Sequence, residues 1–212
     1  MTRIKILVEG QTEETFVRDV LIPRFRSQNK WLVPILAKTS ASGRGGIVSY
    51  GKIKHQVTRL CRKDKGAYVT TMIDLYGLPM DFPGRNSAPQ GSCFDRARYL
   101  EQEFSQNINE INFIPNLLVH EFEGLLFSEP EKFGEWFVES VVTSLVEINN
   151  SFSSPEEIND SPQTAPSKRI QAVTRGYQKT LHGPLIGYDI GLDTIRNKCT
   201  HFGNWLAKLE RL

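Results

Sequence analysis

Apolar residues gather in four short runs, each followed by polar or turn-forming residues. The runs cover residues 4–8, 31–36, 67–73 and 113–119. Continuous apolar runs of this length are typical of strands that are buried on both faces of a parallel sheet. We therefore predict four strands in a mostly parallel sheet.

The segments between these strands repeat their apolar residues every three or four positions, as amphipathic helices do. They predict helices over 16–21, 47–62, 94–104 and 133–148. Pro23 is expected to end or kink the first helix, because proline cannot donate the helical hydrogen bond. Strands that alternate with helices predict a Rossmann-like α/β fold in which helices cover both faces of the sheet.

Residues 149–166 are rich in Asn, Ser and Pro and form the most loop-like stretch of the chain. We place a domain boundary at the start of this stretch. It divides the chain into an α/β core, residues 1–148, and a helical C-terminal part, residues 149–212. In the C-terminal part, one helix carries an apolar stripe that is expected to pack in the core: Phe202, Trp205, Leu206 and Leu209.

Acidic residues stand at the end of three of the four predicted strands. They are Glu9 with Glu13 one helical turn later, Asp74, and Glu121 with Glu123. Because parallel strands end at one edge of the sheet, we expect these carboxylates to converge and to raise the pKa of at least one of them. Mg²⁺ or Mn²⁺ relieves such repulsion, prefers oxygen ligands and commonly serves phosphate chemistry. The pattern therefore predicts that all five acids are metal ligands.

Structural roles compete with this interpretation. Glu9 is also suited to capping the helix that follows it, Asp74 to forming a turn, and Glu121 or Glu123 to pairing with an arginine. The neighbouring His120 is a metal ligand, a proton shuttle or a structural hydrogen-bonding residue. The recurrence of acids at corresponding points of successive strands favours the metal site.

Three further segments have alternative interpretations. The basic residues between 52 and 63 are either a solvated helix face or a surface that contacts phosphates. The loop 75–84 contains Tyr76, Leu78, Met80 and Phe82, and it either folds back on the core or forms a binding surface. The glycine-rich residues 39–46 lack the Gly-Lys-Ser/Thr ending of a phosphate-binding loop, so a mobile loop is favoured there.

Composition narrows the function classes only a little. An apolar content of 39% and a net charge of +2 are ordinary for a soluble domain and give no general attraction to nucleic acid or membranes. The three scattered cysteines indicate neither a disulfide framework nor a thiolate zinc site. No His-x-x-x-His or Gly-x-Ser-x-Gly motif points to a zinc or serine hydrolase. Without an apolar signal region or membrane span, a cytoplasmic protein is expected.

Several blocks carry a resemblance to known families. Leu-Val-Glu-Gly-Gln-Thr-Glu-Glu at 7–14, followed by a strand that ends in Asp74, resembles the Toprim (topoisomerase–primase) fold. It is closest to the version in overcoming-lysogenization-defect nucleases, whose first strand ends in Glu-Gly-x-Thr/Ser-Asp/Glu. Over nearly its whole length the chain resembles the bacterial family called domain of unknown function 4276. The further blocks are Met-Ile-Asp-Leu-Tyr-Gly-Leu-Pro, His-Glu-Phe-Glu-Gly-Leu-Leu-Phe, Pro-Ser-Lys-Arg-Ile and Ile-Gly-Leu-Asp-Thr-Ile-Arg-Asn-Lys-Cys-Thr-His-Phe.

The Toprim resemblance implies an acidic metal site and chemistry at phosphodiesters. Glu9 corresponds to the first-strand acid, Glu13 to the acid one turn later, and Asp74 to the first Asp of an Asp-x-Asp pair. Tyr76 stands where the second Asp belongs, and the acids at 121 and 123 are expected to supply the missing ligands. Lys168 corresponds to a cation that stabilises phosphate charge. The resemblance also implies an ATPase partner encoded beside it in bacterial defence loci.

These observations lead to two hypotheses. The first is a Mg²⁺- or Mn²⁺-dependent nuclease with Glu9, Asp74, Glu121 and Lys168 as catalytic residues and nucleic acid, DNA rather than RNA, as substrate. The second is a non-catalytic interaction subunit on a degenerate Toprim scaffold. Tyr76 in place of the second acid, and the apolar loop 75–84, motivate the second.

Overall fold

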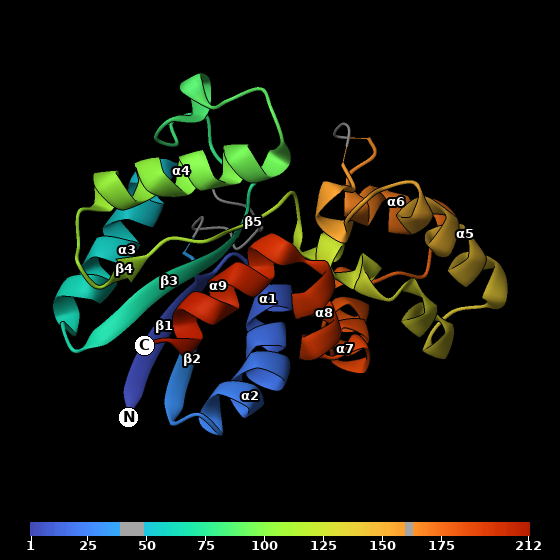
Figure 1. Ribbon diagram of the computed structural model, residues 1–212, viewed down its shortest axis with the longest axis horizontal. Coiled ribbons are helices and arrows are strands. Elements are labelled where there is room, and N and C mark those ends of the chain that lie inside the picture. Colours follow the sequence, from blue (N-terminus) through green and yellow to red (C-terminus); the bar gives the residue numbers. More distant parts are fainter. Residues whose placement is uncertain (39–48, 160–162) are drawn as a thin grey trace. The chain divides into compact units, whose positions relative to one another are not determined.

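The computed structural model describes residues 1–38, 49–159 and 163–212 (Figure 1). The glycine-rich segment 39–46 lies outside the described residues. The chain divides into two compact units, residues 1–118 and 119–212, whereas the sequence prediction placed the division at residues 148/149.

Unit 1 is built on a parallel sheet. Its strands are β1 Thr2–Val8, β2 Lys30–Leu36, β3 Ala67–Asp74, β4 Phe113–Ile114 and β5 Leu117–Leu118. The order is β2-β1-β3-β4, and β5 also pairs with β3. Every pairing is parallel, and Val8 at the end of β1 lies opposite Leu36 and Met72. The predicted parallel α/β sheet is confirmed.

The last predicted strand, residues 113–119, is two strands, so the sheet has five strands in the described residues and not four. Pro115 has no N–H to donate to the ladder. At the next residue, the buried side chain of Asn116, instead of a backbone group, forms the hydrogen bond to β3. Its Nδ2 donates to the carbonyl of Thr71 at 3.0 Å, and the Thr71 hydroxyl donates to the Asn116 carbonyl at 2.6 Å. The strand therefore breaks and resumes at β5.

Helices cover both faces of this sheet. The first helical run comprises α1 Gln11–Phe16, a π-helical segment Val17–Leu21 and α2 Ile22–Arg26; α3 spans Tyr50–Lys63 and α4 spans Cys93–Ile108. Figure 1 shows α1 and α2 on one side of the strands and α3 and α4 on the other, as right-handed crossovers in opposite directions require. Pro23 does not end the first helical run. It lies in the first turn of α2, after the wider π-helical turn, where a missing N–H is tolerated.

The loop 75–84 folds back on the core of unit 1. Leu78 and Phe82 are 4% and 3% exposed. Phe82 makes edge-on ring contacts with Tyr50 of α3 at 5.3 Å and Phe104 of α4 at 5.1 Å between ring centroids. Met80 stays exposed. The loop therefore packs on the core through Leu78 and Phe82, and it leaves Tyr76 and Met80 exposed.

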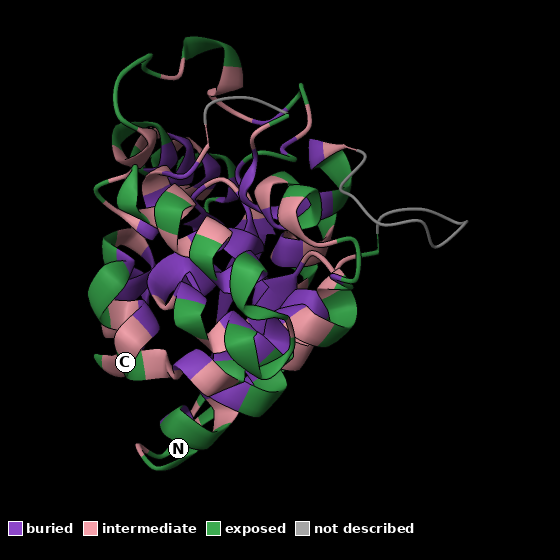
Figure 2. Cartoon of the chain, turned by 90° about the vertical axis from the view of Figure 1, so that its right-hand side faces the viewer, coloured by how far each residue is buried: buried purple, intermediate pink, exposed green. Residues whose placement is uncertain are grey.

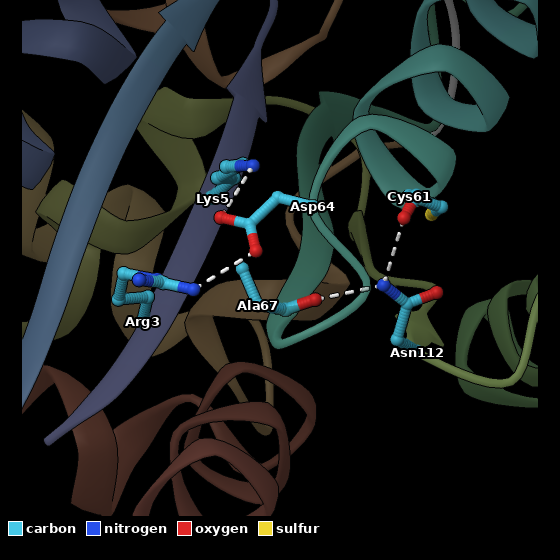
Figure 3. Close-up of polar contacts among 6 residues, drawn as sticks. All are labelled: Arg3, Lys5, Cys61, Asp64, Ala67 and Asn112. Atoms are coloured by element: carbon cyan, nitrogen blue, oxygen red, sulfur yellow. Dashed lines mark hydrogen bonds and ion pairs between the residues drawn. The ribbon is translucent and has the colours of Figure 1, made fainter.

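The amino ends of β1 and β3 are held by polar contacts (Figure 3). Asp64, between α3 and β3, accepts from Arg3 at 2.9 Å and from Lys5 at 3.2 Å. Asn112 Nδ2 donates to the carbonyls of Cys61 at 3.3 Å and Ala67 at 2.7 Å. These bonds fix the turn that follows α3 and the approach to β4.

Unit 2 is helical, as predicted for the C-terminal part. Its elements are 3₁₀ segments Phe122–Ser128, Pro130–Glu135 and Pro155–Glu157, and helices α5 Glu139–Asn150, α6 Pro166–Val173, α7 Lys179–Ile190, α8 Leu192–Lys198 and α9 Thr200–Glu210. Buried residues lie on the inward sides of the helices (Figure 2). Phe202, Trp205, Leu206 and Leu209 of α9 are all buried, which confirms the predicted stripe. Across the described residues, no helix has the length and apolar character needed to cross a bilayer.

The predicted helix over 133–148 is wrong in its first turn. The chain forms a 3₁₀ segment up to Glu135, and α5 begins only at Glu139. Between them, Trp136 directs its Nε1 to Asp189 of α7 at 3.0 Å, and Val138 is extended as the residue before α5. A contact with a distant helix thus overrides the local helical spacing.

Candidate functional site

Glu9 and Asp74 lie side by side at the carboxyl edge of the sheet. The backbone N–H of Glu9 donates to the Met72 carbonyl at 3.2 Å, which extends the β1–β3 ladder by one residue. The Glu9 side chain then reaches across to the neighbouring strand, where its Oε2 accepts from the N–H of Asp74 at 3.2 Å. Both residues are half-buried. Two of the predicted acids are therefore brought together by adjacent parallel strands.

Glu13 folds back on the turn that follows Glu9. Its Oε2 accepts from the N–H of Gly10 at 2.8 Å, and the residue is 7% exposed. This bond caps α1, so the capping role considered for Glu9 belongs to Glu13. A Cβ added at Gly10 would lie 3.1 Å from Glu13 Oε2. Glycine thus leaves the room that this carboxylate occupies beside the turn.

The loop after β3 closes near the same edge. A Cβ at Gly77 would lie 3.6 Å from Glu9 Oε1, so the turn through Tyr76 and Gly77 passes beside the Glu9 carboxylate. Tyr76 is 39% exposed and offers a phenol where the resemblance expects a second acid. No group of three or more His, Cys, Asp or Glu side chains is arranged to hold a metal ion in the described part of the chain. Among the described residues, the edge therefore offers two neighbouring acidic residues, Glu9 and Asp74, and no complete metal-binding cage.

Glu121 is a helix cap within unit 2. It is 9% exposed, and its Oε2 accepts from the backbone N–H of Ser167 at 3.0 Å. Ser167 is the second residue of α6, whose first-turn N–H groups have no partner within the helix. A carboxylate at this position also interacts favourably with the helix dipole. Glu121 therefore orients α6, on which the predicted cation Lys168 is exposed.

Glu123 is the most deeply buried of the predicted acids, at 2% exposed. Its Oε1 lies 3.3 Å from Nζ of Lys179, at the start of α7. Loss of solvation on burial raises the pKa of Glu123 to about 7; the Lys179 charge lowers it, and the nearby Glu121 raises it. The expectation of a raised pKa is met at this residue, but burial is its main cause and charge repulsion is secondary.

His120 precedes these acids in a left-handed backbone conformation, with φ of +64°, which is uncommon for residues other than glycine. Its ring Nδ1 lies 3.1 Å from Nδ2 of Asn159. This contact gives the ring a structural hydrogen bond to the residue two positions after the 3₁₀ segment Pro155–Glu157. That segment contains Glu156, which is 3% exposed and accepts from the N–H groups of His201 at 2.8 Å and Phe202 at 3.0 Å, capping α9.

Sequence reasoning missed the partners of the unit 2 acids. Ser167 and Lys179 are distant in sequence from the acids they contact, as Asn159 is from His120, and no local motif identifies them. The acidic pattern itself gave the only usable signal. It pointed to acids that are buried or half-buried in the structure, but it did not distinguish a ligand from a cap.

Residues 8–210 match the family described as a domain of unknown function, DUF4276. The chain belongs to this family. The DUF4276 match starts at the last residue of β1, so it includes every acid described above. No curated protein and no solved structure matches this DUF4276 chain.

Proposed function

We propose that this DUF4276 chain is a Mg²⁺- or Mn²⁺-dependent phosphodiesterase that cleaves nucleic acid on a Toprim-like form of the α/β fold. The supporting observation is that the Glu9 carboxylate accepts a 3.2 Å hydrogen bond from the backbone N–H of Asp74, which places the two acidic residues at adjacent strand ends. Mg²⁺ usually binds through one or two carboxylates, several waters and the substrate phosphates. The pair therefore fits such an ion, with a phosphate of the substrate completing the donor set.

Each residue at this edge has a distinct task in the proposal. Glu9 and Asp74 would hold the ion, and Glu13 keeps the intervening turn in shape. When bound, a divalent ion stabilises negative charge on phosphate oxygens and makes a bound water more acidic. An ATPase partner remains part of the proposal, on the family resemblance alone.

Helix α3 supports nucleic acid as the substrate. It contains five lysines and arginines and no acidic residue, while the whole chain carries only +2. Its basic side chains are all exposed: Lys52, Lys54, His55, Arg59, Arg62 and Lys63. Ile53, Val57 and Cys61 are buried on the opposite face. A local basic surface on an otherwise nearly neutral chain is typical of a phosphate-binding surface.

The amino end of α3 lies toward the acidic edge. β2 and β3 run parallel in one sheet, so the connecting helix runs back in the opposite direction. Gln56 Oε1 accepts from the N–H of Lys38, just after β2, at 2.9 Å, and Asp81, after β3, accepts from the N–H of Tyr50 at 3.0 Å. From Lys52 to Lys63 the helix rises about 16 Å. A backbone bound along it would lead to Glu9 and Asp74.

The binding role of α3 has a separate test. Arg59→Gln with Lys63→Gln removes two exposed charges one helical turn apart, and Arg24→Gln with Arg96→Gln removes two exposed charges on other helices as a control. Fluorescence anisotropy in EDTA measures DNA affinity across a salt series. The first variant should reduce the slope of log K against log salt by about 1.4 to 1.8. Equal slopes for both variants would remove α3 from the proposal.

Cleavage is tested on purified protein with plasmid, single-stranded DNA and RNA in Mg²⁺ or Mn²⁺, with and without the ATPase encoded beside it. Glu9→Gln and Asp74→Asn should each reduce the rate at least a hundredfold, because both preserve shape but remove a charged ligand. Glu14→Gln, the next acid on α1, should cleave at the wild-type rate. Equal cleavage by Glu9→Gln and wild type would refute the proposal.

The second candidate, a non-catalytic interaction subunit, is favoured by Tyr76 and by the lack of a three-ligand group among the described residues. Calorimetric titration with Mn²⁺ separates the two candidates. Tight binding that Asp74→Asn abolishes supports the enzyme. No measurable binding, together with capture of the neighbouring ATPase that Met80→Asp weakens, supports the interaction subunit. Met80 is the suitable probe because it is 71% exposed.

A further inference from the structure

The turn that follows β3 presents a tyrosine ring beside the acidic edge. The N–H of Leu78 donates to the Leu75 carbonyl at 3.4 Å and closes a β-turn. Tyr76 and Gly77 are its central residues. Leu75 and Leu78 are buried, and the N–H of Leu75 also donates to the carbonyl of Leu118 in β5 at 2.9 Å. Because both flanks of the turn are anchored in unit 1, the turn holds the exposed Tyr76 in place.

The loop that contains this turn connects the acidic edge to the basic helix. At its start, a Cβ added at Gly77 would lie 3.6 Å from Glu9 Oε1, which is van der Waals distance. Further along the same loop, Asp81 accepts from the N–H of Tyr50, the first residue of α3, at 3.0 Å. A nucleic acid strand that runs from the basic side chains of α3 to the acids would therefore pass Tyr76.

The exposure of Tyr76 distinguishes it from the packing residues of this loop. Leu78 and Phe82 are buried, whereas Tyr76 is 39% exposed. An exposed apolar residue alone is ordinary. An exposed ring close to phosphate-binding charges is instead the combination with which proteins bind single strands: basic side chains contact the backbone and aromatic rings stack on the bases. In a duplex the base faces are covered by neighbouring base pairs, so stacking on Tyr76 requires an unpaired base.

We propose that the acidic edge takes single-stranded nucleic acid and that Tyr76 stacks on a base next to the phosphate held at Glu9 and Asp74. This role of Tyr76 rests on the proposed function, because it specifies which form of nucleic acid the same site accepts. The ring of Tyr76, and not its hydroxyl, selects unpaired bases. The position at which the Toprim resemblance expects a second acid thus serves substrate recognition.

Binding in the absence of cleavage tests this role. Fluorescence anisotropy in EDTA measures the affinity of the full chain for a labelled oligothymidine strand and for a duplex of the same length. Tyr76→Ala should weaken binding of the single strand about 5- to 100-fold, the loss expected for one stacked base, and should leave the affinity for the duplex unchanged. Tyr76→Phe should bind the single strand as wild type does, because it retains the ring. Circular dichroism confirms that each variant is folded.

Trp31→Ala is the matched control. Trp31 is 45% exposed and lies opposite Arg3 near the amino end of the same sheet, with the guanidinium of Arg26 in α2 5.4 Å from its ring centroid. Its removal should leave the affinities for single strand and duplex unchanged. Equal single-strand affinity of wild type and Tyr76→Ala, or an equal loss in Trp31→Ala or in Tyr76→Phe, overturns the stacking role.

Photo-cross-linking locates the contact directly. A single strand that carries 5-iododeoxyuridine cross-links on irradiation to an aromatic ring stacked against the modified base. Mass spectrometry should then identify the peptide that contains Tyr76 as the cross-linked one. Cross-links confined to other residues would contradict the proposal.

The stacking role and the phosphodiesterase can fail separately. Cleavage by wild type, together with unchanged single-strand binding by Tyr76→Ala, overturns the stacking role and leaves the phosphodiesterase. Single-strand affinity that depends on Tyr76, without any cleavage in Mg²⁺ or Mn²⁺, supports single-strand recognition at this edge and refutes the phosphodiesterase.

Discussion

Glu123 should make the protein less stable as pH rises toward neutral. Its carboxyl is 2% exposed, and loss of solvation raises its pKa from 4.5 to about 7. Below pH 4.5 the carboxyl is protonated in both the folded and the unfolded chain, so it contributes no difference. Between pH 4.5 and 7 the unfolded chain releases the proton while the folded chain retains it. The free energy of unfolding therefore falls through this window and stays low above it.

The magnitude follows from the shift in pKa. Each pKa unit corresponds to about 1.4 kcal/mol, so the full penalty above pH 7 is about 3 kcal/mol. This figure already includes the favourable charge of Lys179, which partly offsets the burial. Glu123→Gln keeps the shape of the side chain and cannot ionise. It should stabilise the protein by up to about 3 kcal/mol at pH 8 and have little effect at pH 4.5.

Urea unfolding of wild type and Glu123→Gln at several pH values from 4.5 to 8 measures this difference. Because the chain has two units, circular dichroism and tryptophan fluorescence should be followed together to show whether one transition or two occur. Glu131→Gln, at an exposed acid of the same unit, is the control and should change stability equally at every pH. A Glu123→Gln effect that does not vary with pH, or that is destabilising at pH 8, would show that burial of the charged carboxylate costs nothing.

Two further substitutions test the packing described above. Leu78→Asp places a charge in the core of unit 1 and should reduce the free energy of unfolding by about 4 kcal/mol or more. Met80→Asp in the same loop is the control and should change the free energy of unfolding by less than about 0.5 kcal/mol. Similar losses for the two variants would mean that the loop does not fold back on the core. Glu156→Ala leaves two backbone N–H groups of α9 without their acceptor and should lower the free energy of unfolding by about 2 kcal/mol. Glu157→Ala, at the half-buried neighbouring residue, is the control and should have a smaller effect. Thermal unfolding measures both variants.

The sequence predicted those parts of the fold that local pattern controls. Three of the four predicted strands appear within a residue or two, because each is a continuous apolar run that only a covered sheet can bury. The prediction missed the break between β4 and β5 although Pro115 lies within the run. The contact of Asn116 with Thr71 across the sheet, which completes the break, could not be predicted from local pattern. The late start of α5 has the same origin in the contact between Trp136 and Asp189.

In the candidate site, too, some neighbours were predictable from the sequence and others were not. Glu9 and Asp74 were predicted to be neighbours because parallel strands end at one edge, and the hydrogen bond between the Glu9 side chain and the Asp74 backbone agrees with that reasoning. For Glu121 and Glu123 the sequence indicated only that acids follow a strand. Their partners, Ser167 and Lys179, lie more than forty residues later, and such pairings depend on tertiary structure that periodicity does not encode.

The two prolines in the sheet region have a consequence for solubility. β2 stands at one end of the strand order and β4 with β5 at the other. β2 exposes Trp31, Val33 and Leu36, the kind of outer strand on which another chain can add itself as a further strand. Pro34 lies within β2, and a proline there cannot donate to an incoming strand. Pro115 interrupts the opposite end. Replacing Pro34 with valine should therefore promote aggregation of the folded protein while leaving the rest of the sheet intact.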